Sequence, residues 1–184
     1  MLLPIVSPAA IAASLRRFRR NRRGSAAVEF ALVAPMFFAL IFAIIETSLV
    51  FFAGQILETG TQDSGRLLFT SQVQASGMSA TDFKTDLCNR VSVMFTCANI
   101  YVDVKSYAAG TAITISDPID SAGNFVNNFT YAPPANGSDA TVVVRAFYQW
   151  PLIVTGLGYN IANIGRGTSN SKRLLAATAA FRPQ

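Results

Sequence analysis

The 184-residue chain has no histidine, only two cysteines, and few charged residues, which make up 14% of its composition. Without histidine it cannot build a Ser-His-Asp triad or a zinc site with histidine ligands, and two cysteines cannot supply a four-cysteine site. The sequence also lacks the nucleophile motif G-x-S-x-G, the phosphate loop G-x-x-x-x-G-K-[ST] and the dinucleotide motif G-x-G-x-x-G. We therefore expect no enzyme activity, no cofactor and no metal ion.

The positive charge of the chain is concentrated at its N-terminus. Six of the fifteen basic residues precede residue 24, and the remainder carries nine basic and ten acidic residues, a net charge of −1. A basic patch is one sign of nucleic-acid binding, but the rest of the chain offers no basic surface to extend it. Arginines beside an apolar segment more often mark the cytoplasmic flank of a membrane helix. We expect this topological role, and no nucleic acid, for Arg16, Arg17, Arg19, Arg20, Arg22 and Arg23.

A long apolar segment follows the arginines. Residues 30–45, FALVAPMFFALIFAII, contain no charge; Glu46 then interrupts the run before TSLVFFAG continues it. Counted through Ala53, the segment is long enough to cross ~30 Å of hydrocarbon as a helix, which needs about 20 residues. A secretory signal peptide would be shorter and would end in small residues, whereas Phe51 lies where a small residue is needed. We therefore expect one membrane helix over about residues 30–53.

Glu29 lies near the start of this segment, five residues after Gly24. A carboxylate costs about 2.5–3.5 kcal/mol at the centre of a membrane helix and less near the interface, so its presence suggests a function. If a protease cut after Gly24, Ser25 would carry a new ammonium group that could pair with Glu29 of a neighbouring chain. Alternatively, Glu29 reaches the cytoplasmic headgroups, which its place at the edge of the segment permits. The physical argument alone does not decide between these.

The arginines, Gly24, the sequence SAAV, Glu29, Phe30 and the apolar helix together resemble the prepilin cleavage motif of type IV pilins. The pair of Glu29 and Phe30 resembles the version found in tight-adherence (Flp) pili. Three further stretches are similar to the TadE-like pseudopilins of that system: residues 31–68, YQWPLIVTGLG at 148–158 and LLAATAAFR at 174–182. The resemblance is weak over residues 108–138, and the leader before Gly24 is long.

The resemblance implies that an inner-membrane prepilin peptidase cleaves between Gly24 and Ser25, and that Glu29 and Phe30 act in processing and assembly. It implies a structural role as a minor pseudopilin of pili used in cell adhesion. The N-terminus would lie in the cytoplasm and the C-terminal domain in the periplasm, with the chain held in the bacterial inner membrane or incorporated into a pilus. The implied partners are the peptidase, other minor pseudopilins, the major pilin, the assembly platform and membrane lipid. The alternatives are an uncleaved single-pass protein with a partner-binding domain and a membrane-anchored enzyme with an unfamiliar site.

The sequence after the membrane segment predicts two helices. Apolar and small residues at spacings of three and four continue the first helix to about residue 75. Ser79 or Thr81 can cap a second, short helix. Its apolar stripe consists of Phe83, Leu87, Val91 and Met94.

Strands are predicted in the C-terminal half. Residues 99–107 alternate in polarity, with Ile100, Val102 and Val104 on one face and Tyr101, Asp103 and Lys105 on the other, which indicates a half-buried strand. Residues 141–150 are expected to form a second strand that Pro151 ends. Residues 173–181 could be a helix by propensity, but their position after a polar loop and the resemblance favour a closing strand. Residues 106–138 read as a loop or a weak hairpin. We expect an α+β fold of three or four antiparallel strands, divided into a leader (1–24), a long helix (25–75) and a periplasmic domain (76–184).

The two cysteines, Cys88 and Cys97, follow the membrane segment. If the arginines stay in the cytoplasm, both cysteines face an oxidising periplasm, where paired cysteines usually form disulfides. The alternative is two buried free thiols. Closing this short loop would stabilise the fold by roughly 2.5–3 kcal/mol in the chain-entropy model.

Overall fold

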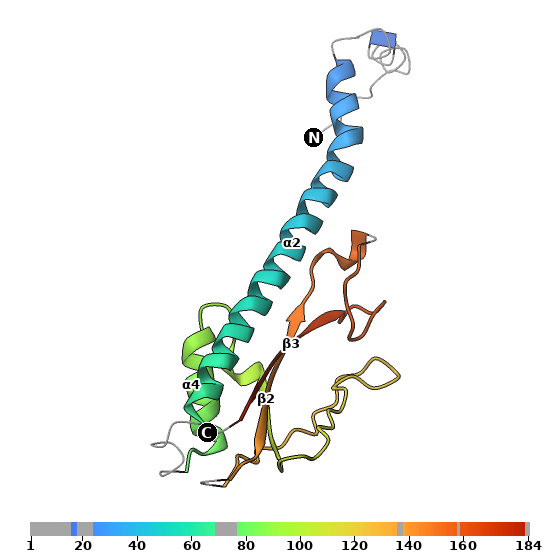
Figure 1. The fold of residues 1–184 in the computed structure, drawn as a ribbon. Helices are drawn as coiled ribbons and strands as arrows, with labels where there is room; N and C mark the ends of the chain where they lie inside the picture. The colour runs from blue at the N-terminus through green and yellow to red at the C-terminus, as the bar shows by residue number, and fades with distance from the viewer. Residues whose placement is uncertain (1–15, 18–23, 69–76, 136–137, 158, 183–184) are drawn as a thin grey trace, which may run out of the picture. The chain divides into compact units, whose positions relative to one another are not determined.

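A computed structural model describes residues 16–17, 24–68, 77–135, 138–157 and 159–182 (Figure 1). The helices are α2 (Ser25–Leu67) and α4 (Ala80–Val91), with short 3-10 helices η2 (Cys97–Asn99) and η3 (Val154–Leu157). The strands are β1 (Ile100–Tyr107), β2 (Thr141–Pro151) and β3 (Lys172–Phe181). The predicted α+β fold, a long N-terminal helix followed by a small antiparallel sheet, is confirmed. The chain forms two compact units, residues 1–42 and 43–184, so that α2 contributes to both.

In the first unit, α2 exposes its apolar side chains. No residue from Gly24 to Phe42 is buried, and Leu32 and Met36 are 74% and 80% exposed. Pro35 lies inside the helix. By length and composition α2 could cross a membrane, and none of its most apolar eighteen-residue window is buried. An apolar helix surface of this extent is expected to be covered by lipid or by other helices.

In the second unit, α2 and α4 cover one face of a three-stranded sheet with the order β1-β2-β3 (Figure 1). All neighbouring strands are antiparallel, with Val104 opposite Val144 and Val144 opposite Ala179. The main core lies between the helices and this face and includes Val50, Ala53, Leu57, Leu87, Val91, Ala146, Tyr148, Leu175 and Ala177. The buried positions of α2 follow the predicted spacing of three and four up to Ser64. The helix ends at Leu67, and residues 69–76 lie outside the described part of the chain.

Two glycines of α2 allow close packing against this helix. A Cβ atom on Gly60 would lie 2.5 Å from Val91 Cγ1, and one on Gly65 would lie 2.6 Å from the ring of Phe181. Contacts this short would force the neighbouring side chains to move. Glycine is therefore needed at these positions so that α4 and the end of β3 can approach α2.

The short helix α4 begins at the predicted cap. The Ser79 hydroxyl accepts a hydrogen bond from the Asp82 N–H, and the Asp82 carboxylate accepts one from the Ser79 N–H, which completes a capping box. Of the predicted stripe, Phe83, Leu87 and Val91 are buried, whereas Met94 lies beyond the end of α4 and is only partly buried against the main core. A disulfide joins Cys88 of α4 to Cys97, with the Cα atoms 5.4 Å apart. It connects α4 to η2, immediately before β1.

We predict that Cys88 and Cys97 resist alkylation in protein taken from its native compartment until a reductant is added. Replacing both by serine should destabilise the domain by about 2.5–3 kcal/mol, because the unfolded chain then regains the entropy that the cross-link removes. Mass spectrometry after alkylation with and without reductant measures the first effect, and urea unfolding measures the second. Free labelling of both thiols without reductant would contradict an oxidising location for this domain.

β1 was predicted to be half-buried, with one polar face, but the face of the sheet that carries Asp103 is covered as well. Asp103, expected on a polar face, is 1% exposed. The reason is that residues 108–135, which form a loop with only isolated pairings such as Val104 with Tyr131, cover this face. Phe125 and Phe129 from that loop pack against Tyr101 and Phe147. The domain thus has a smaller aromatic core on the side of the sheet that faces away from the helices.

Candidate functional site

The predicted cleavage site lies at the start of α2. Ser25 is the first residue of the helix, and both Gly24 and Ser25 are exposed. A Cβ atom on Gly24 would meet nothing within 4 Å, and Gly24 is not among the glycines with positive φ. The fold therefore gives no steric or conformational reason for glycine at this position. Recognition by another molecule, such as a protease subsite that accepts only a small residue, is a functional reason.

Glu29 and Phe30 lie one turn into the helix and are both exposed, Phe30 to 66%. Among the described residues, Glu29 has no hydrogen bond or ion pair, so its carboxylate is available to a partner. Arg16 and Arg17 are exposed as well. Arg19, Arg20, Arg22 and Arg23 lie outside the described residues. The structure thus leaves the predicted roles of these residues in processing, assembly and topology as predictions.

A second carboxylate of α2, Glu46, occupies a site that the sequence did not predict. Glu46 directly follows sixteen uncharged residues, and its side chain is buried, with only 7% exposed. Its carboxylate accepts hydrogen bonds from the backbone N–H groups of Ile153 and Val154; the Val154 nitrogen lies 3.3 Å from both oxygens. Val154 begins η3, so Glu46 supplies acceptors for N–H groups that a helix start leaves unpaired. The only sequence signal was a charge inside an apolar run.

The neighbouring Thr47 makes a second connection to the same part of the domain. Its hydroxyl lies 2.9 Å from the hydroxyl of Tyr159 and donates to the backbone carbonyl of Ala43 at 2.7 Å. Since the Thr47 proton goes to Ala43, the Tyr159 hydroxyl is the donor between the two side chains. Glu46 and Thr47 together attach the chain that follows β2 to one turn of α2.

A buried ion pair on the loop-covered face of the sheet was also not predicted. Arg145 on β2 donates through Nη2 and Nε to one oxygen of Asp103 on β1, at 2.6 and 3.0 Å. The other Asp103 oxygen accepts from the Thr130 N–H at 2.9 Å, and Arg145 Nη1 donates to the Ser116 carbonyl at 2.8 Å. Each group therefore binds the loop as well as its ionic partner. These contacts indicate a structural role for the pair.

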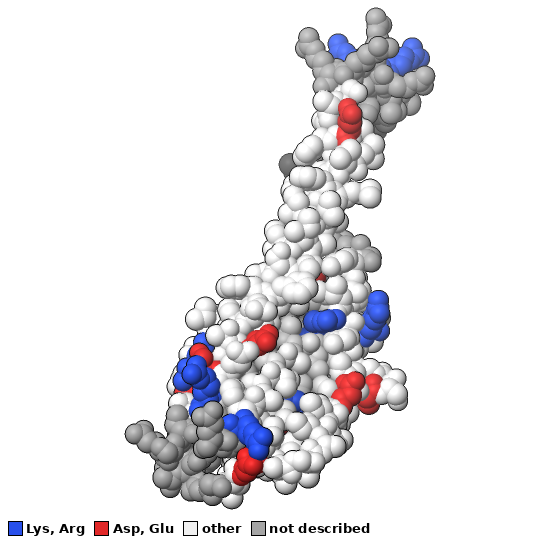
Figure 2. All heavy atoms as spheres, in the orientation of Figure 1, with Lys and Arg blue, Asp and Glu red and all other residues white. Residues whose placement is uncertain are grey.

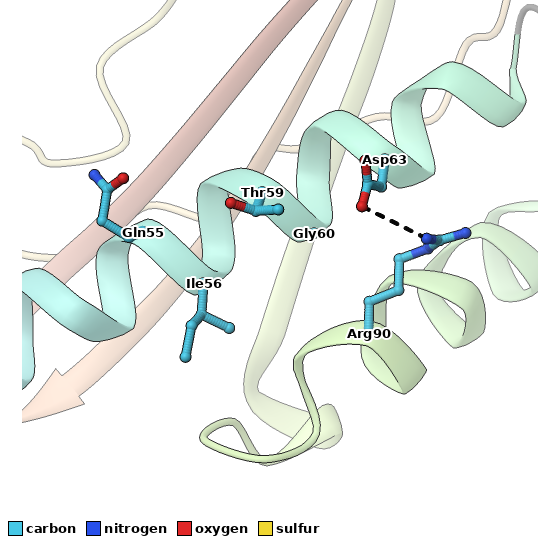
Figure 3. A pocket seen from close by; sticks show the side chains of 6 residues that line it. All are labelled: Gln55, Ile56, Thr59, Gly60, Asp63 and Arg90. Atoms are coloured by element: carbon cyan, nitrogen blue, oxygen red, sulfur yellow. Dashed lines mark ion pairs between the residues drawn. The ribbon is translucent and has the colours of Figure 1, made fainter.

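A hollow of about 320 Å³ lies between α2 and α4 (Figure 3). Figure 3 shows Arg90 of α4 directed towards Asp63 of α2, 3.8 Å away. Arg90 also binds Asp86 at 2.8 Å. Partial burial raises the pKa of Asp86, but hydrogen bonds from Arg90 and Ser64 outweigh this effect and leave it below its ordinary value. The charged groups at this hollow are thus already paired with one another.

A second hollow, of about 530 Å³, is lined by residues of α2, among them Phe51 and Glu58, and by Tyr159 and Arg173 from the C-terminal part of the domain. In Figure 2, acidic and basic side chains are interspersed over the visible face of residues 43–184, without a large area of one sign. Within the described ranges, no group of three or more Asp, Glu or Cys side chains is arranged to hold a metal ion. The features of α2 that suggest a function are its exposed start, its apolar surface and the carboxylates of Glu29 and Glu46.

Comparison with known proteins identifies the same helix. A family model described as TadE-like protein matches residues 24–66. No curated protein and no solved structure matches the chain. The predicted TadE-like resemblance is confirmed for this segment, which begins at Gly24 and ends one residue before α2 does. The resemblance of residues 148–158 and 174–182 lies outside the matched segment and stays a prediction.

Proposed function

We propose that this chain, which carries a TadE-like segment, is a minor pseudopilin needed for the assembly of tight-adherence pili. The observation that carries the proposal is the family match over residues 24–66, which begins at the predicted cleavage site and covers nearly all of the apolar helix α2. The family and the single apolar helix among the described residues suggest a pilus-associated protein with one membrane anchor. Such a role is structural, and catalytic groups are not required for it.

The proposed maturation starts in the inner membrane. The arginines hold residues 1–24 in the cytoplasm, so the domain after α2 enters the periplasm. A prepilin peptidase then cuts the bond between Gly24 and Ser25, which is exposed at the start of the helix. Cleavage removes the six arginines and leaves an ammonium group on Ser25. The mature chain can then leave its membrane position, because the charges that fixed its N-terminus are gone.

The exposed carboxylate of Glu29 supports a contact between mature chains. Ser25 and Glu29 are separated by four residues, a rise of about 6 Å along an α-helix. A neighbouring helix shifted by this distance would place its Ser25 ammonium beside Glu29. In a poorly hydrated environment each charge alone is unfavourable, so the pair would fix the axial stagger of the two helices. The apolar surface of α2 would supply the remaining contact between them.

The direct test is the intact mass of the chain extracted from the membranes of cells that contain the peptidase. We expect the mass of residues 25–184, with Ser25 as the N-terminal residue. A chain that retains its arginine cluster under these conditions would contradict the pseudopilin proposal. It would favour an uncleaved single-pass protein with a partner-binding periplasmic domain.

We predict that Glu29→Gln impairs incorporation into pilus assemblies while the domain stays folded. Glutamine keeps the shape of the side chain but removes its charge, so the neighbour's ammonium group loses its partner. Breaking a fully buried ion pair costs about 3–5 kcal/mol, and breaking a pair near the headgroups costs less. Cleavage should continue at least partly, because it depends more on Gly24. Crosslinking from a cysteine placed at Ala26 to pilin partners, together with the yield of sheared pili, measures the effect.

The matched control is Glu58→Gln, the same substitution at another exposed position of α2. It should leave crosslinks and piliation unchanged. If Glu29→Gln also leaves both at the wild-type level, the carboxylate is not an assembly contact, and its orientation to lipid headgroups is sufficient to explain it.

A further inference from the structure

The side chain of Ile153 is unusually exposed for its type. It lies between the end of β2 and the start of η3, and its 90% exposure is the highest among the large apolar residues that the structure describes. Its backbone N–H donates to the Glu46 carboxylate. Ile153 is therefore held beside position 46 of α2, directly after the sixteen-residue run without charge.

The length of the apolar run places this position at a membrane surface. A helix needs about 20 residues to cross the hydrocarbon core. Counted from Phe30, where the charge-free run begins, a span of this minimum length ends at about residue 49, before the limit of residue 53 expected from the apolar sequence; counted from Ser25, it ends at about residue 44. Both counts put Glu46, and with it Ile153, within one helical turn of the boundary between hydrocarbon and headgroups.

The groups around Ile153 suit that depth. A carboxylate at the edge of hydrocarbon needs donors, and Glu46 receives them from the N–H groups of Ile153 and Val154. Tyr159 is 39% exposed and directs its hydroxyl to Thr47. Aromatic residues with one polar group are enriched at membrane interfaces. On α2 itself, Phe51 and Phe52 remain 72% and 59% exposed just beyond Glu46.

We propose that Ile153 is a lipid-contacting residue, which inserts among the acyl chains just below the headgroups, with Tyr159 at headgroup level. The partner is the bilayer surface around α2. Glu46 positions Ile153 for this contact, because its carboxylate accepts a hydrogen bond from the Ile153 N–H. The carboxylate also accepts from the Val154 N–H, so it does not enter the membrane interface as an unpaired acceptor. The contact holds the folded domain against the membrane. The inference rests on the membrane anchoring in the proposed function, but not on cleavage or pilus assembly.

The test uses single added cysteines in the full chain. Because the disulfide uses both native cysteines, an added cysteine is the only free thiol. Ile153→Cys is compared with Phe38→Cys in the middle of the apolar run and with Ile113→Cys. Ile113 is 46% exposed and precedes Thr114, which accepts a hydrogen bond from Tyr107 at the opposite end of the sheet. Each variant carries a polarity-sensitive fluorophore in vesicles of phosphatidylethanolamine and phosphatidylglycerol.

Spin-labelled lipids then report depth through quenching. We expect the Ile153 label to be quenched several-fold more than the Ile113 label, and more by a spin label high on the acyl chain than by one on the headgroup. If the Phe38 label is quenched and the Ile153 label is not, the inference is wrong while the membrane anchoring stands. If Ile153 is shielded from water without lipid quenching, a second protein chain covers it, which also overturns the inference. An unquenched Phe38 label would overturn the anchoring and the inference together.

Discussion

Gly24→Leu is expected to leave the chain uncut, so that membrane extracts contain only the form that retains residues 1–24. The proposed reason is steric: the peptidase subsite for the residue before the cut accommodates glycine and excludes a branched side chain. The fold itself should accept the change. Gly24 is exposed, a Cβ atom there would meet nothing within 4 Å, and leucine is a good helix former. Loss of cleavage would therefore not be a consequence of misfolding.

The matched control for this experiment is Gly54→Leu. Gly54 lies in the same helix, and a Cβ atom on it would likewise meet nothing within 4 Å. Its replacement should leave cleavage at the wild-type level, whereas Gly24→Leu should abolish it. Intact mass and the electrophoretic ratio of precursor to mature chain measure both. A mature-length product from Gly24→Leu would show that this glycine does not define the cleavage site.

The elements of the fold that could be predicted from the sequence are those with local signals. Ser79 begins α4 because its hydroxyl and the Asp82 carboxylate pair with each other's backbone N–H, a contact within four residues. The apolar residues of 141–150 give β2, and Pro151 ends it. Residues 173–181 are the exception. Their local propensity favours a helix, but pairing with β2 and burial of alternate residues make them the strand β3.

The contacts that could not be predicted join residues far apart in the sequence. Asp103 and Arg145 are 42 residues apart, and Glu46 and Ile153 are 107 apart. Read alone, Asp103 belongs to the polar side of an alternating strand, and the loop that covers it is rich in turn-forming residues. The loop covers a second core through the aromatic contacts of Phe125 and Phe129 and through its hydrogen bonds to Asp103 and Arg145, none of which the local sequence indicates.

The start of α2 presents the opposite case. Gly24 and Glu29 are both exposed, and the structure gives neither a packing role. If both residues serve recognition by another molecule, as we propose, they need no partner within the chain. Their interpretation depended on the arrangement of arginines, glycine, glutamate and apolar helix, which the family match supports for residues 24–66.

The largest loss of stability is expected from Arg145→Met. Asp103 and Arg145 are 1% and 4% exposed, so removing the guanidinium leaves a carboxylate buried with only the Thr130 N–H and the Lys105 ammonium, which is 3.7 Å away. Breaking one side of a buried pair costs about 3–5 kcal/mol, which is a large fraction of the about 5–15 kcal/mol that stabilises a typical domain. Urea unfolding of the detergent-solubilised chain, followed by the fluorescence of its single tryptophan, Trp150, measures the loss.

Two further variants serve as the control for this prediction and as a test of its cause. Arg182→Met makes the same substitution in a pair with Asp139 whose side chains are 62% and 64% exposed, and it should change stability little because solvent screens such pairs. The double variant Asp103→Val with Arg145→Met should recover much of the loss, since no unpaired charge stays buried. If Arg145→Met were no more destabilising than Arg182→Met, the charge pair would not be holding the loop against the sheet. If the double variant were as unstable as Arg145→Met alone, the cost would come from lost packing around Phe147 and not from the unpaired Asp103 carboxylate, because the guanidinium lies 5.2 Å from the centre of that ring.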